Sequence, residues 1–215
     1  MIKGAIFDVD GTLLDSMHIW GELGERYLTS IGKKAEEGLA QILLSMTLAE
    51  SSAYVKKTYG IPDTVDQIKE DALKLLENIY QNETEPKPGV IAYLTFLRSK
   101  NVPMALATAG DRKILIAALK RLKIADLFDV ILTCAELNTN KRDSLIYRRA
   151  AETLGSRPEE TVVFEDVLYG IQTAKDAGFI TVGVEEAASE KDREAIRTIA
   201  DYYICDFNDP ILRTL

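Results

Sequence analysis

The chain of 215 residues has few of the side chains that build disulfide frameworks or zinc centres. It contains two cysteines and one histidine. Neither Cys134 nor Cys205 has a nearby histidine or a second cysteine at the spacing of metal ligands. Both cysteines end apolar, strand-like segments, so we expect two buried, reduced thiols. This scarcity argues against a zinc site and against a fold held together by disulfides.

Long hydrophobic runs and an excess of positive charge are also absent. No apolar segment approaches the ~20 residues that span a bilayer, and the chain opens on a strand-like segment without a basic and then apolar leader. The net charge of −8 disfavours nucleic acid and anionic membrane surfaces as partners, because both would repel the protein's average field. We therefore expect a cytoplasmic protein that binds neither, although local basic groups could still hold a small anion.

The apolar residues, 47% of the chain, are arranged in short strand-like runs that alternate with segments of helical period. Strands are predicted at 2–8, 102–108, 129–134, 161–165, 180–184 and 201–205, with helices among the later ones at 113–122, 144–154, 170–177 and 190–199. Such alternation predicts an α/β fold, a Rossmann-like parallel sheet with helices on both faces. In sheets of this kind, ligands bind at the carboxyl ends of the strands.

A helical segment interrupts this alternation after the first strand. Residues 16–86 show no convincing strand, whereas Thr47-Leu48-Ala49-Glu50 and Thr64-Val65-Asp66-Gln67 both fit the capping box that begins a helix. We expect a small all-helical cap domain at 16–86, over the strand ends, inserted into a core domain formed by residues 1–15 and 87–215.

Two aspartates follow the first strand one residue apart. Asp8 and Asp10 would point to the same side of a continuing strand. At an effective dielectric constant of about 20, two carboxylates roughly 4 Å apart repel by about 4 kcal/mol. A metal ion, a lysine or a shared proton must therefore neutralise them.

Further polar residues end the other strands of the predicted sheet. Thr108 and Ala109 follow the second strand, Glu165 and Asp166 end the fourth, and Lys141 is expected to begin the helix before the fourth strand. Two carboxyl groups, a hydroxyl, a lysine and an acidic pair form a complete set for phosphoryl transfer through an aspartyl-phosphate with Mg²⁺.

This set resembles the haloacid dehalogenase superfamily, in particular subfamily IA members with a helical cap, such as β-phosphoglucomutases and related phosphatases. The resemblance covers nearly the whole chain, and its four motifs occur in order: Asp8-Val9-Asp10-Gly11-Thr12, Thr108, Lys141, and Phe164-Glu165-Asp166 followed by Gly170-Ile171 and Ala177-Gly178.

The resemblance implies roles for the four acidic residues. Asp8 resembles the nucleophile that attacks phosphorus, and Asp10 the acid that protonates the leaving oxygen and then deprotonates water. Mg²⁺ would be held by Asp8, by the backbone carbonyl of Asp10 and by Asp166, with Glu165 as a ligand or a supporting residue.

The resemblance also implies a phosphate-binding set. Thr108, the amides near Ala109 and Lys141 would hold the oxygens of the transferring phosphoryl group. Three departures from the family pattern remove none of these groups: Ala109 replaces a common Ser or Asn, Arg142-Asp143-Ser144 replaces a proline-rich turn, and Val167 replaces a small residue.

Simpler roles compete with these for several residues. Asp166 could be the N-cap of the helix that follows it, and Asp15 or Ser16 the N-cap of the first inserted helix. His18, the single histidine, is expected at the surface or in packing, and Trp20 in the apolar core of its helix. A calcium loop of the EF-hand type is disfavoured, because the glycine lies three rather than five positions after Asp8.

The function expected from these residues is a Mg²⁺-dependent phosphatase of small phosphorylated metabolites, acting as a monomer or weak homodimer. Carbon–halogen hydrolysis would not need an acid at position 10. A phosphosugar mutase of the β-phosphoglucomutase type is the main alternative, but Trp20 stands where those enzymes have a cap histidine, and Arg26 is the single arginine in 16–80. A non-catalytic phosphate-binding protein is the third hypothesis.

Overall fold

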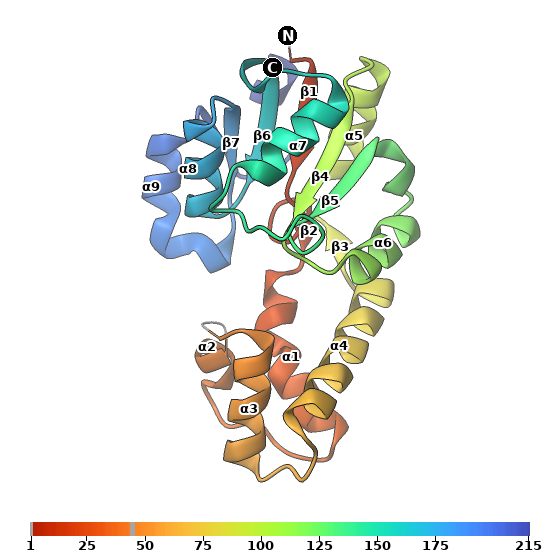
Figure 1. Ribbon diagram of the computed structural model, residues 1–215, viewed down its shortest axis with the longest axis vertical. Helices are drawn as coiled ribbons and strands as arrows, with labels where there is room; N and C mark the ends of the chain where they lie inside the picture. Colours follow the sequence, from red (N-terminus) through yellow and green to blue (C-terminus); the bar gives the residue numbers. More distant parts are fainter. Residues whose placement is uncertain (1, 44–45) are drawn as a thin grey trace. The chain divides into compact units, whose positions relative to one another are not determined.

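The structure is a computed structural model that describes residues 2–43 and 46–215. The chain forms two compact units, one made of Met1–Asp15 with Glu85–Leu215 and the other of Ser16–Thr84 (Figure 1). The first unit contains the sheet and the second is entirely helical in its described part.

A six-stranded parallel sheet organises the first unit, with the strand order β5-β4-β1-β6-β7-β8. Its strands are β1 (Gly4–Phe7), β4 (Met104–Thr108), β5 (Val130–Thr133), β6 (Thr161–Glu165), β7 (Ile180–Val184) and β8 (Tyr202–Ile204). All six predicted strands are confirmed. Because β1 lies between β4 and β6, the carboxyl ends of these three strands are neighbours.

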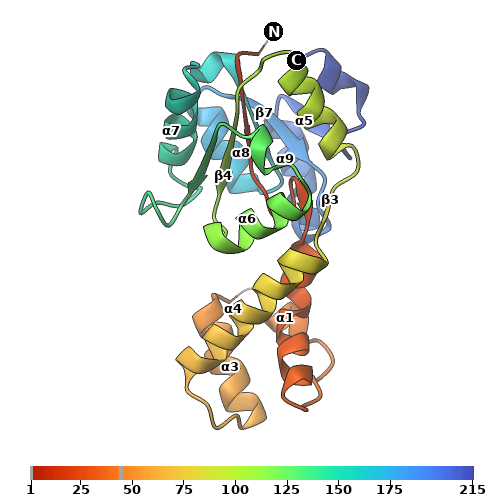
Figure 2. The ribbon, with the colours of Figure 1, turned by 90° about the vertical axis from the view of Figure 1, so that its right-hand side faces the viewer.

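Helices cover both faces of this sheet, as predicted; α5 and α7 lie on opposite sides of it (Figure 2). The α-helices are α5 (Val90–Ser99), α6 (Arg112–Arg121), α7 (Leu145–Leu154), α8 (Leu168–Asp176) and α9 (Arg193–Ile199), and the 3-10 helices are Ala125–Leu127, Pro158–Glu160, Ala187–Asp192 and Pro210–Arg213. The predicted start of α7 at Lys141 is wrong, because Ser144 is its N-cap and Lys141 lies in the preceding loop.

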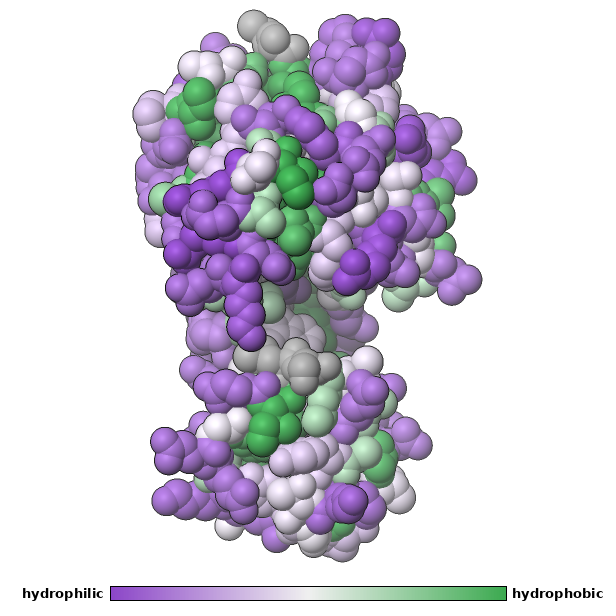
Figure 3. All heavy atoms as spheres, turned by 90° about the vertical axis from the view of Figure 1, so that its left-hand side faces the viewer, coloured by the Kyte–Doolittle hydropathy of each residue, from purple (hydrophilic) through white to green (hydrophobic). Residues whose placement is uncertain are grey.

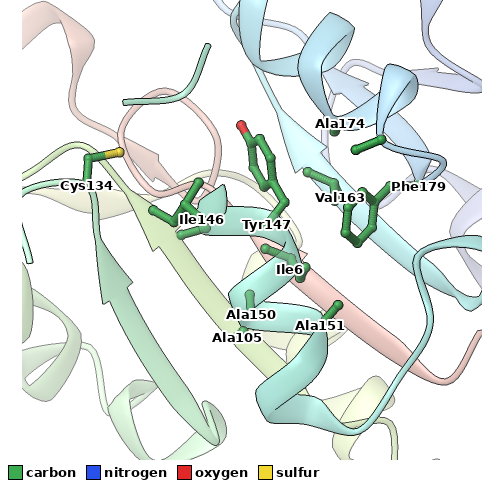
Figure 4. Packing of buried hydrophobic residues seen from close by; sticks show 12 residues of the cluster. Ile6, Ala105, Cys134, Ile146, Tyr147, Ala150, Ala151, Val163, Ala174 and Phe179 are labelled. Atoms are coloured by element: carbon green, nitrogen blue, oxygen red, sulfur yellow. The ribbon is translucent and has the colours of Figure 1, made fainter. Parts of the chain in front are cut away.

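The core packs against both faces of β1. Ile6 points into a cluster with Ala150 and Ala151 of α7 and with Phe179 (Figure 4). The next residue, Phe7, points to the other face, where its ring stacks on Phe164 at 4.6 Å between centroids. Alternate residues of the strand are thus buried on opposite sides, which fixes the register of β1 up to its last residue.

The second unit consists of α1 (Met17–Ser30), α2 (Leu39–Leu43), α3 (Leu48–Tyr59) and α4 (Val65–Asn82). Both predicted capping boxes are confirmed: Thr47 and Glu50 close the start of α3, and Thr64 and Gln67 close the start of α4. Both helices therefore begin where their own sequence satisfies the first backbone N–H groups.

Trp20 is half-buried rather than a fully buried core residue. Its ring lines a cavity of about 220 Å³ between α1, α3 and α4, and its indole N–H donates to the Tyr80 hydroxyl at 3.1 Å. The exposed position of His18 agrees with the expected surface role.

A short antiparallel pair, β2 (Leu14–Asp15) with β3 (Glu85–Pro86), joins the two connections to the helical segment. The sequence predicted no strand in 16–86, and the pair is too short to leave a hydrophobic pattern. Pairing with β2 places Glu85 and Pro86 in the first unit rather than in the insertion.

The two cysteines differ in burial. Cys134 is buried, whereas Cys205 is exposed, and both are free thiols. The prediction of burial is therefore wrong for Cys205, because it follows β8, the edge strand of the sheet, and β8 ends at Ile204.

No described helix has the length and hydropathy needed to cross a membrane. Figure 3 shows one face of the molecule, on which hydrophilic residues predominate and hydrophobic ones are scattered. Scattered apolar residues are normal on a folded protein and mark no contact surface by themselves.

The chain returns from the helical segment through Lys87 and Gly89, which are tied to the sheet unit. The buried ammonium of Lys87 pairs with Glu186 at 2.8 Å and donates to the Glu185 carbonyl at 2.6 Å. The Lys87 backbone N–H donates to the Leu13 carbonyl at 2.8 Å. This segment is therefore attached to the end of β7 and to the turn after β1.

Gly89→Ala should destabilise the protein more than a matched glycine substitution. Gly89 has φ of +82°, and a Cβ built on it would lie 2.5 Å from the backbone carbon of Phe207. Gly155 has φ of +68° with nothing within 4 Å of such a Cβ. Gly155→Ala should therefore lower the free energy of unfolding only by the ~1–2 kcal/mol that a non-glycine residue pays in the left-handed conformation. Urea unfolding of both variants measures the difference; equal losses would contradict the close approach at Gly89.

Candidate active site

A tight turn follows β1 and holds the two aspartates of the first motif. The Val9 carbonyl accepts the backbone N–H groups of Leu13 and Leu14, both at 2.9 Å. The Asp8 N–H donates to the Phe164 carbonyl at 3.0 Å, so the pairing of β1 with β6 continues through Asp8. The backbone therefore aligns Asp8 beside the acidic end of β6.

Three carboxylates and one lysine meet at these strand ends. Asp8, Glu165 and Asp166 are buried, and each offers a carboxylate oxygen within 4.8 Å of the others. Lys141 is also buried and forms ion pairs with Asp8 and with Glu165, the latter at 2.5 Å. The structure thus brings together four of the residues that the sequence singled out, from β1, β6 and the loop before α7.

The electrostatics of this cluster are unbalanced. Burial, together with the charges of Asp8 and Glu165, raises the pKa of Asp166 well above its usual range. Burial also raises the pKa of Glu165, to about 7, although Lys141 opposes the shift. Burial alone would lower the pKa of Lys141, but the two adjacent carboxylates outweigh it and raise that pKa, so the ammonium stays charged.

A divalent cation fits this imbalance. Among the described residues, Lys141 alone forms an ion pair with these carboxylates, so one positive charge faces three potential negative ones. Glu165 Oε2 and Asp166 Oδ2 are buried and have no hydrogen-bond partner there. Buried carboxylate oxygens without partners are costly unless a cation binds them, and oxygen is the ligand that Mg²⁺ and Ca²⁺ prefer.

Thr12 orients one of these acids and was not assigned a role from the sequence. Its buried hydroxyl donates to Asp166 Oδ1 at 2.8 Å, which leaves Oδ2 as the oxygen without a partner. The alternative that Asp166 caps α8 is wrong, because Val167 is the N-cap and no side-chain cap bond forms. Its position in the first motif was the only signal for Thr12.

Asp10 lies outside the three-carboxylate cluster and beside the loop after β4. A Cβ built on Gly110 would lie 3.0 Å from Asp10 Oδ2 and 3.3 Å from Thr108 Oγ1, so both side chains border Gly110. Thr108 is buried, and its oxygen accepts the Gly110 N–H at 2.9 Å, which leaves the hydroxyl hydrogen to donate elsewhere. Ala109 is exposed. The proposed metal contact of the Asp10 carbonyl stays a prediction.

The loop after β4 is braced by an ion pair that sequence reasoning missed. Arg112, the first residue of α6, binds both carboxylate oxygens of Glu136, at 2.5 and 2.8 Å, and this contact lowers the pKa of Glu136 to about 2. The Cys134 N–H donates to the Thr108 carbonyl at 2.8 Å. These contacts connect the loops after β4 and β5, and only the folded chain brings them together.

Comparisons with known proteins found relatives that match most of the chain. The family model described as haloacid dehalogenase-like hydrolase matches residues 5–184. The chain is 30% identical over 177 residues to a phosphorylated carbohydrates phosphatase of Thermotoga maritima, covering 82% of each chain. It is 30% identical over 213 residues to a validoxylamine A 7′-phosphate phosphatase of Streptomyces hygroscopicus subsp. limoneus, covering 89% of this chain and 92% of the relative.

A solved structure described as a putative β-phosphoglucomutase from Thermotoga maritima has the same fold. It superposes with a TM-score of 0.85 at 27% identity, and the match covers 94% of each chain.

Asp166→Asn should stabilise the metal-free protein while weakening its response to metal. The raised pKa means that the ionised carboxylate is less favourable in the folded than in the unfolded state, so this carboxylate lowers stability above a pH of about 4. Without metal at pH 7, we expect the variant to unfold about 2–4 °C above the wild type, the shift that about 1 kcal/mol makes in a chain of this size. The difference should shrink as the pH falls towards 4.

Thermal unfolding in chelator and in excess Mg²⁺ measures both effects. Mg²⁺ should raise the wild-type melting temperature more than that of the variant, since only the wild type presents all three carboxylates. A metal-free variant that is less stable than the wild type at pH 7 would contradict the charge imbalance.

Proposed function

The chain belongs to the haloacid dehalogenase-like hydrolases, and from this membership we propose that it hydrolyses small phosphate monoesters by way of a phosphorylated Asp8. The observation that carries the proposal is the buried cluster in which Lys141 pairs with Asp8 beside Glu165 and Asp166. In this cluster the Lys141 ammonium lies beside the Asp8 carboxylate, the group that would act as the nucleophile.

The reaction has two steps that share one intermediate. A carboxylate oxygen of Asp8 forms a bond to phosphorus while the bond to the leaving oxygen breaks, and Asp10 gives that oxygen a proton. Asp10 then takes a proton from water as the water oxygen attacks phosphorus, which releases phosphate and restores Asp8. The half-buried position of Asp10, outside the metal-type cluster, is consistent with exchange of protons with substrate and water.

The transferring phosphoryl group would be bound by Lys141, Thr108 and the backbone amide near Ala109. An ammonium has three N–H donors, and the ion pairs with Asp8 and Glu165 account for two. The Thr108 hydroxyl accepts from Gly110 and so retains its own hydrogen for a phosphoryl oxygen. Donors held in place in this way stabilise negative charge as it develops on phosphoryl oxygens.

Mg²⁺ would be held by Asp8, Asp166 and the Asp10 carbonyl, with Glu165 as a further ligand or support. When bound, it supplies the positive charge that lets a carboxylate approach an anionic phosphate. The unpartnered oxygens of Glu165 and Asp166 support this assignment.

The substrate class that we propose is a small phosphorylated metabolite of the sugar-phosphate kind. The two relatives are a phosphatase of phosphorylated carbohydrates and one of validoxylamine A 7′-phosphate. The net charge of −8 also makes an anionic polymer an unfavourable substrate.

A phosphosugar mutase is the second candidate, favoured by the likeness to the putative β-phosphoglucomutase structure. The helical unit offers little support for it. The Trp20 indole N–H donates to Tyr80, and an indole provides no base. The Arg26 guanidinium already pairs with Glu22 at 3.0 Å and with Glu83 at 2.7 Å, so binding a second phosphate would require breaking these pairs. A non-catalytic phosphate-binding protein would need neither Asp10 nor the buried nucleophile.

Asp8→Asn should abolish turnover of p-nitrophenyl phosphate and leave the fold intact, because the amide has nearly the same volume but cannot attack phosphorus. Asp10→Asn should lower kcat by about 10²–10⁴-fold, the usual contribution of general acid–base catalysis. Asp126→Asn, at an exposed position in the 3-10 helix Ala125–Leu127, is the matched control and should keep wild-type activity. Wild-type activity in Asp8→Asn would rule out the covalent mechanism.

Supplied with β-glucose 1-phosphate and a trace of the bisphosphate, the protein should release free phosphate faster than it forms glucose 6-phosphate. Water is expected to be the acceptor from phosphorylated Asp8, because Trp20 offers no base and Arg26 is already paired with Glu22 and Glu83. An enzyme-coupled assay for glucose 6-phosphate, run beside a phosphate assay, measures the ratio. Rapid isomerisation with little phosphate release would instead support the mutase.

A further inference from the structure

Tyr147 is a fully buried polar side chain to which the chemistry above gives no role. It lies in the first turn of α7, and its ring packs in the apolar cluster beneath that helix, 6.3 Å from the Phe179 ring (Figure 4). Figure 4 shows the hydroxyl oxygen at the far end of the ring. That hydroxyl donates to Glu165 Oε1 at 2.7 Å.

The two oxygens of Glu165 have different surroundings. Oε1 receives hydrogen bonds from both the Tyr147 hydroxyl and the Lys141 ammonium, at 2.7 and 2.5 Å. Oε2 is buried and has no hydrogen-bond partner among the described residues. Two donors use the lone pairs of one oxygen, so the other remains for a cation.

Gly170 limits the same carboxylate from another side. A Cβ built on Gly170 would lie 2.8 Å from Cδ of Glu165 and 2.9 and 3.1 Å from its two oxygens. The first turn of α8 therefore passes against the carboxylate and leaves it little room to rotate. The carboxyl group is held by two donors on one side and by a helix backbone on another.

We propose that Tyr147 is a positioning residue of the metal site: its hydroxyl, together with Lys141, occupies Oε1 of Glu165 and directs Oε2 to the divalent cation. This inference rests on the proposed function, which requires that cation. Hydrogen bonds behind a metal ligand fix its orientation, and their loss typically weakens metal binding about 10–100-fold.

The role of Tyr147 also bears on Lys141. Because the Tyr147 hydroxyl also donates to Oε1, Glu165 accepts two hydrogen bonds, and the Lys141 ammonium can stay in contact with both Glu165 and Asp8. Tyr147→Phe would leave Lys141 as the single donor to Glu165, so that one hydrogen bond rather than two would determine which carboxylate oxygen faces the cation. The variant should therefore lose metal affinity more than it loses kcat at saturating metal.

The test is direct binding of Mn²⁺ to the full chain, measured from the electron paramagnetic resonance signal of the free ion. Tyr147→Phe should bind Mn²⁺ about 10–100-fold more weakly than the wild type. In saturating Mg²⁺ it should recover most of the wild-type kcat on p-nitrophenyl phosphate. Circular dichroism checks that the variant is folded.

Tyr93→Phe is the matched control. Tyr93 is also fully buried in the sheet unit, but its hydroxyl has no hydrogen-bond partner among the residues that the structure describes. Its removal should leave the Mn²⁺ affinity at the wild-type value. Equal weakening in both tyrosine variants would overturn the positioning role.

The remaining outcomes separate this inference from the proposed function. Wild-type and Tyr147→Phe proteins that bind Mn²⁺ equally would overturn the role of Tyr147 and leave the phosphatase standing. A wild type that binds no Mn²⁺ and hydrolyses phosphate esters in chelator would overturn the role of Tyr147 and the metal site, whereas one that binds Mn²⁺ but hydrolyses no phosphate ester would overturn the phosphatase alone. If Tyr147→Phe does not fold, Gly170→Ala tests the premise that Glu165 binds the cation, because its Cβ displaces that carboxylate: weaker Mn²⁺ binding supports this premise, and unchanged binding overturns the inference.

Discussion

The interaction on which the site depends is the pairing of one buried ammonium with two of three buried carboxylates. The single positive charge of Lys141 cannot neutralise Asp8, Glu165 and Asp166 together. The folded protein is therefore more stable when a further cation binds at this cluster. The charge imbalance destabilises the empty site and at the same time gives it affinity for a metal. Stability and function are opposed at this point of the fold, as they often are at active sites.

The rest of the sheet unit makes this unfavourable cluster tolerable. Its acids stand at the carboxyl ends of two adjacent central strands, β1 and β6, which pair residue by residue and bury apolar side chains on both faces. Neighbouring backbone groups are occupied as well: the turn after β1 closes on Val9, and the return segment is bound through Lys87. Because these elements cannot shift separately, the carboxylates cannot relieve their repulsion by moving apart.

Much of this arrangement could be predicted from the sequence because its signals are local. Each strand of the parallel sheet is a short apolar run, and the acids directly follow such runs, so their convergence follows from the fold class. The capping boxes of α3 and α4 were readable for the same reason, since four consecutive residues carry the whole signal. The substrate could not be predicted in this way, because no local pattern in the inserted helices indicates which leaving group the protein binds.

The errors and omissions concern contacts between distant residues. The bond from Tyr147 to Glu165 spans 18 positions and that from Thr12 to Asp166 spans 154, and no periodicity reports either. The prediction that Asp166 caps α8 was wrong, because its side chain instead accepts the Thr12 hydroxyl and lies among the buried carboxylates. The exposure of Cys205 likewise depends on which strand forms the sheet edge, and that is a property of topology.

The β2–β3 pair makes the helical segment a detachable module. Asp15 and Glu85, the last and first residues of the sheet unit at this junction, face each other across an antiparallel pair. Because the chain leaves and re-enters the sheet unit at adjacent points, the path of the sheet unit stays the same when the intervening segment changes. A longer segment also adds little entropic cost of loop closure. In evolution, or in the laboratory, one set of helices could therefore be exchanged for another, or for a two-residue hairpin turn, while the catalytic scaffold keeps its topology.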